Sequence, residues 1–272
     1  MYDTKLTTNY ELSIIVPGIR TYNWENLYNS VRDTFGRSWE MVFVGPYPPP
    51  ESLSNKGNIK FIQDWGTPIR CQQIGLLNCS GTWITWIADD GYYLEKGLDI
   101  CFEYIDTITD PMKQIVMNKY YEGQDHTVRM TPEDTVMILK DYYLLSYHDA
   151  TRAPIIPDNY YTLMSGFLHR DLLFEVGGWD CKFEVCPMSY ADLAVRLQNM
   201  GVEFLFPEEV IVKVGHMPCT TGDHAPVHYA QVLNDQPLYT QMYSDPQNIN
   251  RSIIDINNWQ SAATKWQRRF GV

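Results

Sequence analysis

One short segment constrains most strongly what this chain can fold into. It is a run of aromatic and β-branched residues that is followed by two adjacent acids. Residues 83–87 read Trp-Ile-Thr-Trp-Ile, a composition typical of a buried strand, and Asp89, Asp90 and Gly91 follow. Unpaired carboxylates are costly to bury beside such a strand. The pair therefore favours a cation or a polar ligand beyond the strand end. Asp-Asp-Gly is also ordinary turn chemistry, which needs no function.

The chain around this run alternates strand-like and helix-like segments. The expected strands are residues 12–16, 40–44, 59–62, 83–87 and 114–120, and the expected helices are residues 24–35, 67–79 and 98–105. This alternation predicts an α/β fold, an open and mostly parallel sheet with helices on both faces. Ligands of such folds lie at the carboxyl ends of the strands. Pro17, Asp64 and the acid pair all fall at strand ends, so we expect one shared crevice.

The second half of the chain is less regular. Its clearest helix is expected to begin with Ser189 as N-cap and Asp192 at the capping-box position. Further helices are expected at residues 133–145 and 253–269, and further strands at 202–206 and 210–214. The basic, aromatic segment from Lys265 to Phe270 is interpreted as a solvated helix end.

Composition limits the classes of partner and compartment. The 272 residues suit one domain with an elaborated end. With 21 Lys and Arg against 33 Asp and Glu, the net charge of −12 disfavours broad binding to nucleic acid or to an anionic membrane. The six cysteines form no CxxC pair, and we expect free thiols in a reducing, cytoplasmic setting. Neither a signal peptide nor a membrane-spanning apolar run is evident.

Several motifs occur in an order that resembles the family 2 glycosyltransferases. They are LSIIVPG at 12–18, the segment 58–91 that ends in WITWIADDG, SGFLHRDLLFEVGGWDCKFE at 165–184 and SYADLAVRLQNMG at 189–201. The resemblance implies a GT-A fold. We expect this domain over residues 1–225, with a nucleotide-binding part at about 10–120, an acceptor-side part at about 121–225, and a C-terminal helical extension at 226–272.

The resemblance also implies roles for individual residues. Nucleotide-sugar contacts are expected from Pro17, Gly18, Arg20, Asp64, Arg70 and Asp89, acceptor contacts from Gly178, Trp179 and Asp180, metal ligation from Asp90 and His216, and general-base catalysis from Asp192. A divalent cation, Mn²⁺ or Mg²⁺, would neutralise the charge that develops on the leaving diphosphate. A carboxylate across the sugar would take the proton of the acceptor.

The sequence departs from the family pattern at two places. The second strand ends in Gly45-Pro46 instead of acids that contact the base, which leaves the nucleotide open. Ser189-Tyr190 replaces the usual Glu-Asp pair, so Asp192 is the nearest carboxylate, and it could equally pair with Arg196 at i+4. His216 could be a ligand or an ordinary histidine at a strand end. His224 and His228 could reach the site from a loop.

These expectations combine into one hypothesis and one alternative. The first is a metal-dependent inverting glycosyltransferase that moves a sugar from a UDP-, GDP- or dTDP-linked donor to an acceptor hydroxyl. The acceptor would be a glycan, a lipid-linked glycan or a modified nucleic acid, the last disfavoured by the acidic charge. The alternative is a non-catalytic nucleotide-sugar-binding module derived from such an enzyme.

Overall fold

The protein is built on two β-sheets, seen here in a computed structural model that describes residues 10–123, 137–140, 160–215 and 220–271. The larger sheet has seven strands in the order β10 (Glu203–Leu205), β6 (Gln114–Met117), β9 (Gly166–His169), β4 (Gly81–Trp86), β1 (Tyr10–Pro17), β2 (Trp39–Gly45) and β3 (Ile59–Gln63). All its strand pairs are parallel except those of β9, which runs antiparallel to β4 and β6. The open, mostly parallel sheet is therefore confirmed.

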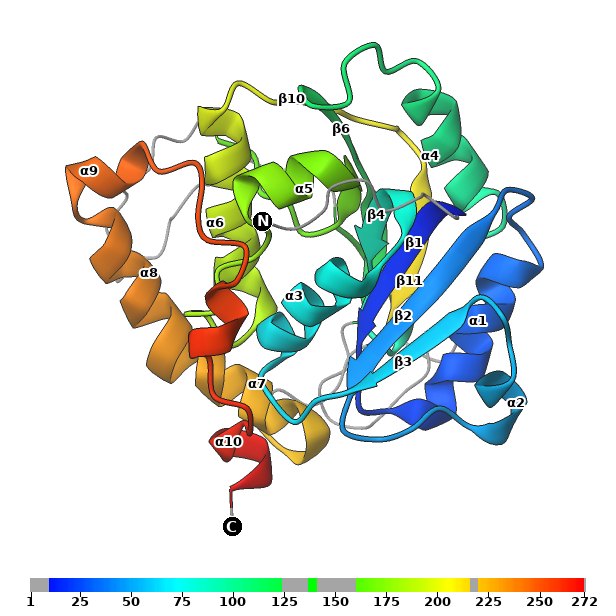
Figure 1. Ribbon diagram of the computed structural model, residues 1–272, viewed down its shortest axis with the longest axis horizontal. Helices are drawn as coiled ribbons and strands as arrows, with labels where there is room; N and C mark the ends of the chain where they lie inside the picture. Colours follow the sequence, from blue (N-terminus) through cyan, green and yellow to red (C-terminus); the bar gives the residue numbers. More distant parts are fainter. Residues whose placement is uncertain (1–9, 124–136, 141–159, 216–219, 272) are drawn as a thin grey trace.

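Helices cover both faces of this sheet (Figure 1). One face packs against α1 (Trp24–Arg32), α2 (Glu51–Ser54) and α4 (Gly97–Ile105), and the other against α3 (Pro68–Asn78), α5 (Arg170–Val176) and α6 (Cys186–Asn199). Because successive strand side chains point to opposite faces, Ile14 and Val16 of β1 join the first core and Ile15 joins the second. A continuous apolar strand of this kind is typical of a parallel sheet buried on both sides.

The smaller sheet adds a second wall next to the acid pair. Its strands are β5 (Gly91–Tyr93), β11 (Val210–Val214), β7 (Lys119–Gly123) and β8 (Met137–Lys140), in that order. The expected strand over 114–120 divides at Asn118, so that β6 stays in the large sheet and β7 enters the small one. Residues 137–140 are a strand, so a helix over 133–145 is wrong at these four positions, and its other residues lie outside the described part of the chain.

The C-terminal part begins with helices and then becomes irregular. It contains α7 (Ala225–Ala230), a π-helical segment (Gln231–Asp235), α8 (Gln236–Tyr243) and α9 (Pro246–Ile249), and ends with the short α10 (Gln267–Phe270). A continuous helix over 253–269 is wrong, because the segment contains only a 3-10 turn at Asn258–Ser261 and the start of α10, and part of it bonds to the core. Ile254 N–H donates to the carbonyl of Val176, and Gln73 donates to the carbonyl of Ile256.

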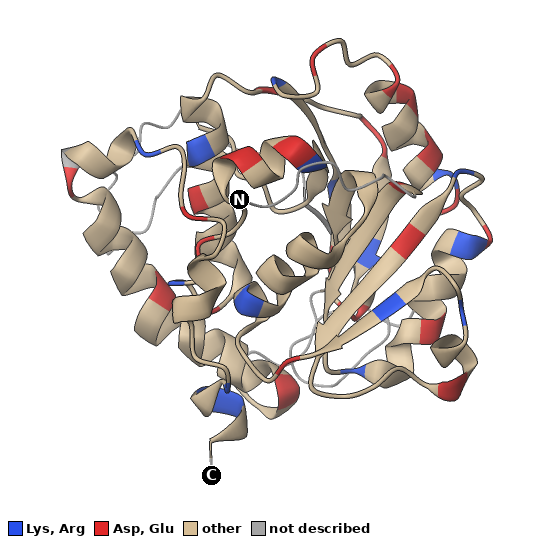
Figure 2. Cartoon of the chain, in the orientation of Figure 1, with Lys and Arg blue, Asp and Glu red and all other residues tan. Residues whose placement is uncertain are grey.

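Charge is spread over the molecule. Figure 2 marks acidic residues on several helices and strands, with basic residues scattered among them. In the described part of the chain, no helix is both long and apolar enough to cross a bilayer. The five described cysteines, Cys71, Cys79, Cys101, Cys181 and Cys186, are free thiols.

A buried carboxylate joins the first strands of the large sheet. Glu40 on β2 accepts hydrogen bonds from the hydroxyls of Ser13 (2.6 Å) and Ser80 (2.9 Å). The Ser13 hydroxyl in turn accepts one from the N–H of Gly81 at the start of β4 (2.7 Å). One side chain therefore fixes the relative position of β1, β2 and β4, whose opposite ends form the pocket described below.

Replacement of Glu40 tests this connection. We expect Glu40→Ala to lower the free energy of unfolding by about 3 kcal/mol, because it leaves buried donors without an acceptor. Urea denaturation followed by tryptophan fluorescence measures the change. Glu103→Ala, an exposed position on α4, is the control and should change stability by less than about 0.5 kcal/mol. Equal denaturation midpoints for the two variants would contradict the assignment.

Candidate functional site

A pocket lies at the carboxyl ends of β1, β2 and β4, where α/β folds hold their ligands. Its cavity volume is about 270 Å³, and its floor is formed by residues 17–20, 44–46 and 86–90. The start of α6, the strands β7 and β11 and the C-terminal segment form the other walls. Of the expected nucleotide-sugar and metal residues, Pro17, Gly18, Arg20, Asp89 and Asp90 line this pocket.

Arg20 binds both acids of the pair. Its Nε donates to Asp89 Oδ1 (2.7 Å), and its guanidinium lies 2.9 Å from Asp90 Oδ2. The other Asp89 oxygen accepts the backbone N–H groups of Ile19 (2.7 Å) and Arg20 (2.6 Å). Although burial opposes the charged form, the Arg20 charge and these donors hold the pKa of Asp89 below its usual value. Asp89 therefore fixes the 17–20 loop and stays ionised.

Two glycines permit this arrangement. A Cβ at Gly18 would lie 2.9 Å from the Asp89 Cβ, and a Cβ at Gly45 would lie 1.9 Å from the Gly18 carbonyl oxygen. The N–H of Gly18 donates to the carbonyl of Val44 at 3.0 Å. The glycine that ends β2 in place of an acid is thus required by the close approach of the neighbouring loop.

The described residues do not by themselves complete a metal site. A hard divalent cation takes about six or more oxygen ligands, several of them from the protein or its substrate. Among the residues that the structure describes, no group of three or more His, Cys, Asp and Glu side chains is arranged to hold an ion. Asp89 is engaged by the 17–20 loop and Asp90 by the Arg20 guanidinium, and both carboxylates line the pocket. His216 lies outside the described residues.

Asp64 and Arg70 contact each other and do not line the pocket. The Arg70 guanidinium lies 3.1 Å from Asp64 Oδ2, and its NH1 group donates to the backbone carbonyls of Trp259 and Ala262. The structure therefore places this predicted nucleotide-binding pair between the start of α3 and the C-terminal segment, where it joins the two.

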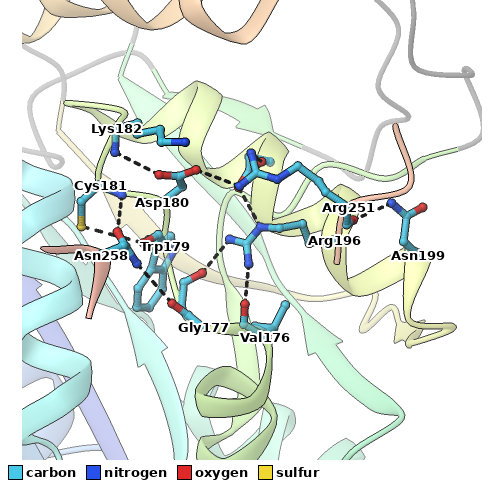
Figure 3. Close-up of polar contacts among 12 residues, drawn as sticks. Val176, Gly177, Trp179, Asp180, Cys181, Lys182, Arg196, Asn199, Arg251 and Asn258 are labelled. Atoms are coloured by element: carbon cyan, nitrogen blue, oxygen red, sulfur yellow. Dashed lines mark hydrogen bonds and ion pairs between the residues drawn. The ribbon is translucent and has the colours of Figure 1, made fainter. Parts of the chain in front are cut away.

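The Gly-Gly-Trp-Asp motif is buried in the same region. Gly178 adopts φ +68°, and a Cβ there would lie 2.2 Å from Gln73 Oε1. That oxygen accepts the N–H of Trp179 at 2.9 Å. Asp180 pairs with Arg251 at 2.8 Å (Figure 3). None of Gly178, Trp179 and Asp180 lines the pocket, so the structure gives the expected acceptor-binding residues a scaffolding position.

Asp192 lies inside α6 and is completely buried. Because the helix begins at Cys186, with Val185 as N-cap, the expected Ser189 cap is wrong and Asp192 is not at a capping-box position. Its oxygens bind Arg196 Nε (2.8 Å), the Tyr243 hydroxyl (2.6 Å) and Arg251 (2.9 Å). The pairing with Arg196 is therefore the interpretation that the contacts support. Asp192 does not line the pocket, so it is not positioned to take a proton there.

The pocket contains functional groups that sequence reasoning did not assign. They are Glu122 on β7, Asp223 and His224 before α7, and Arg269 on α10. His224 belonged to the loop already considered for the site, whereas His228 does not line the pocket. The 265–270 segment is a solvated helix end only in part, because Lys265, Gln267 and Arg268 are exposed. Its other residues, Trp266, Arg269 and Phe270, line the pocket. The mixture of aromatic and basic residues in this segment was the sequence feature that could have predicted its place at the pocket.

Replacement of Asp192 separates a structural role from a catalytic one. We expect Asp192→Asn to lower the free energy of unfolding by about 3–5 kcal/mol, because it leaves the buried Arg196 without a carboxylate partner and Arg251 with Asp180 alone. Tyr243→Phe removes one hydrogen bond and should cost about 1 kcal/mol. Urea denaturation gives both values, and turnover is measured on the folded fraction. Wild-type stability together with lost turnover in Asp192→Asn would restore the catalytic assignment.

Comparisons with known proteins identify the fold. No protein-family model matches the sequence, and no curated protein matches it either. The solved structure of S. aureus TarS 1–349 in complex with UDP-GlcNAc is similar, with a TM-score of 0.55, 13% identity and 92% of this chain covered. The complex with UDP gives a TM-score of 0.50 at 14% identity and covers 86% of this chain.

A further TarS 1–349 structure gives a TM-score of 0.53 at 14% identity over 75% of this chain. The chain spans 60% of that structure, 69% of each of the two complexes and 42% of a longer TarS structure. At such identities the likeness concerns the fold. The chain has the α/β architecture of the GT-A glycosyltransferases, as its motifs predicted.

Proposed function

We propose that the protein is a glycosyltransferase that moves a sugar from a nucleotide-diphosphate sugar to an acceptor hydroxyl with inversion. The observation that carries this proposal is the position of Arg20 and the Asp89–Asp90 pair at the strand-end pocket of a GT-A fold. The TarS structures with UDP-GlcNAc and UDP support a uridine-linked donor as the first to test. A glycan hydroxyl is the proposed acceptor.

In the proposed reaction, the bond from the anomeric carbon to the diphosphate oxygen breaks as a bond to the acceptor oxygen forms. Negative charge then increases on the diphosphate, and Arg20 is the cation of the pocket floor that can stabilise it. Burial raises the pKa of Cys186 to about 12 and that of Cys71 well above its usual value. Both pocket thiols are thus neutral near pH 7, which supports direct transfer without a thiolate nucleophile.

We propose Glu122, instead of Asp192, as the general base that takes the acceptor proton. Glu122 lines the pocket from β7 of the small sheet, whereas the acid pair follows β4 of the large sheet. The acid pair also directly precedes β5, and Gly91 and Glu122 are both in register with Val214 of β11, so the two carboxylate sources lie two strands apart beside one cavity. This separation suits a base on one side of the sugar and a leaving group on the other.

We also propose that Asp90 and His216 are ligands of a divalent cation. A bound Mn²⁺ or Mg²⁺ would supply positive charge to the departing diphosphate. Asp90 supports this proposal because its carboxylate lines the pocket beside the 17–20 loop.

A donor assay with a base variant tests the catalytic proposal. We expect the wild type to release UDP from at least one UDP-sugar with a glycan acceptor, and Glu122→Gln to lower kcat by about 10²–10⁴-fold. UDP affinity should remain, because the substitution keeps the shape of the side chain. The matched control is Glu103→Gln at an exposed position of α4. Unchanged kcat in Glu122→Gln would exclude Glu122 as the base.

The same assay separates the enzyme from the non-catalytic binding module. The engagement of Asp192 by two arginines is the observation that favours the module. A module would bind UDP, GDP or dTDP in the wild type without turnover of any UDP-, GDP- or dTDP-sugar. Turnover that falls in Glu122→Gln would exclude it.

A titration of UDP with and without metal tests the role of Asp90. We expect UDP to bind at least about tenfold more tightly in Mn²⁺ than in EDTA, because the cation would offset the charge of the diphosphate. A tenfold change in the dissociation constant corresponds to about 1.4 kcal/mol. Asp90→Asn should remove this difference, and the exposed Asp33→Asn should retain it. Calorimetry provides the dissociation constants. Equal affinity of the wild type in Mn²⁺ and in EDTA would reject metal-assisted donor binding.

A further inference from the structure

The last helix of the chain forms part of the pocket wall. The short α10 is held in place by its first residues: the N–H of Trp266 donates to the carbonyl of Trp65 (2.7 Å), and its indole Nε1 donates to Glu184 Oε2 (2.5 Å). Arg268 donates to the same Glu184 oxygen at 2.8 Å. Trp266, Arg269 and Phe270 all line the pocket. In Figure 2 the basic residues of this helix colour its ribbon blue.

Arg269 differs from the other arginines in its partners. In the described part of the chain, each of the others lies within 4.0 Å of at least one carboxylate oxygen; they are Arg20, Arg32, Arg37, Arg70, Arg170, Arg196, Arg251 and Arg268. Among these described residues, Arg269 alone has no such ion pair. Its guanidinium donates to the backbone carbonyl of Asp223 and lies against the ring of Trp266, 5.4 Å from the ring centroid.

The surroundings of Arg269 disfavour its charge in the absence of a ligand. Burial lowers the pKa of its guanidinium, and the positive charge of Arg20 lowers it further, while Asp223 and Asp89 act in the opposite direction. Two guanidinium groups that share one partly dry cavity repel each other. An anion bound between Arg20 and Arg269 would offset the repulsion between the two guanidinium groups and accept charge-assisted hydrogen bonds from them.

We propose that Arg269 is a binding residue for the diphosphate of the donor, brought to the pocket from the end of the chain by α10. The inference rests on the proposed function and adds a second cation to Arg20. The diphosphate is the charged part of a nucleotide sugar, and two arginines can neutralise it. Guanidinium groups bind phosphate oxygens through paired N–H donors. The C-terminal segment is accordingly part of the donor site.

Binding of a nucleoside diphosphate and of its nucleoside tests this assignment. Wild type is first titrated with UDP, GDP and dTDP, and the tightest of these is then used with its nucleoside for all variants. Arg269→Gln should weaken the diphosphate about 10- to 100-fold and leave the nucleoside unchanged. Arg269→Lys should recover part of the loss, because it keeps the charge and loses the paired donors.

Two control variants make the result specific. Arg32→Gln removes an exposed charge on α1 and should bind as the wild type does. Arg268→Gln loosens the attachment of α10 to Glu184 without removing a pocket-lining group. Equal losses of diphosphate affinity in Arg268→Gln and Arg269→Gln would show that helix position is responsible and would overturn the proposal.

The outcomes also separate this inference from the proposed function. A wild type that binds a nucleoside diphosphate, together with an Arg269→Gln variant of equal affinity, overturns the role of Arg269 alone. Selective loss of the diphosphate in Arg269→Gln supports it. If the wild type binds none of the three nucleoside diphosphates, the proposed function itself fails, and the role of Arg269 fails with it.

Discussion

The contact of Arg20 with Asp89 and Asp90 is the interaction on which the pocket depends. It joins the loop after β1 to the end of β4, two parallel neighbours at the centre of the large sheet. Asp89 contributes most because it accepts two backbone N–H groups as well as the guanidinium. A buried carboxylate that is satisfied in this way stays charged and orders the loop around it. Gly18 and Gly45 are the steric conditions for the same approach.

This contact changes how a pair of adjacent acids should be interpreted. Two carboxylates at a strand end predict a cation, and the cation that the structure provides is an arginine of the same chain. An arginine there organises the protein before any ligand arrives, whereas a metal ion would come from solution. The proposed roles follow: Asp89 shapes the loop, Asp90 pairs with Arg20 and lines the pocket, and arginines meet the phosphate charge.

The second constraint is the attachment of the C-terminal segment to the sheet domain. Arg70 binds its backbone near Trp259, and Arg251 reaches back to Asp180 and Asp192. Figure 3 shows Arg196, Arg251 and Asn258 around the glycine turn that follows α5. Residues with the appearance of acceptor-site motifs therefore support the segment that delivers Trp266 and Arg269 to the pocket. Few other residue types would fit at these positions, because a buried network of ion pairs tolerates little change in geometry.

The sequence by itself determined the fold class and the pocket floor. Strand and helix periods are local properties, and residues at the ends of neighbouring parallel strands must meet, so Pro17 and the acid pair could be placed in one crevice. Asp64 was expected in the same crevice, but it pairs with Arg70 and does not line the pocket. Tertiary structure decided which polar groups face the cavity. Asp192 and Arg269 each occur in an ordinary helical sequence, yet the first is enclosed by two arginines and the second lies at the pocket. That difference arises from long-range packing of the last segment, which no local pattern specifies.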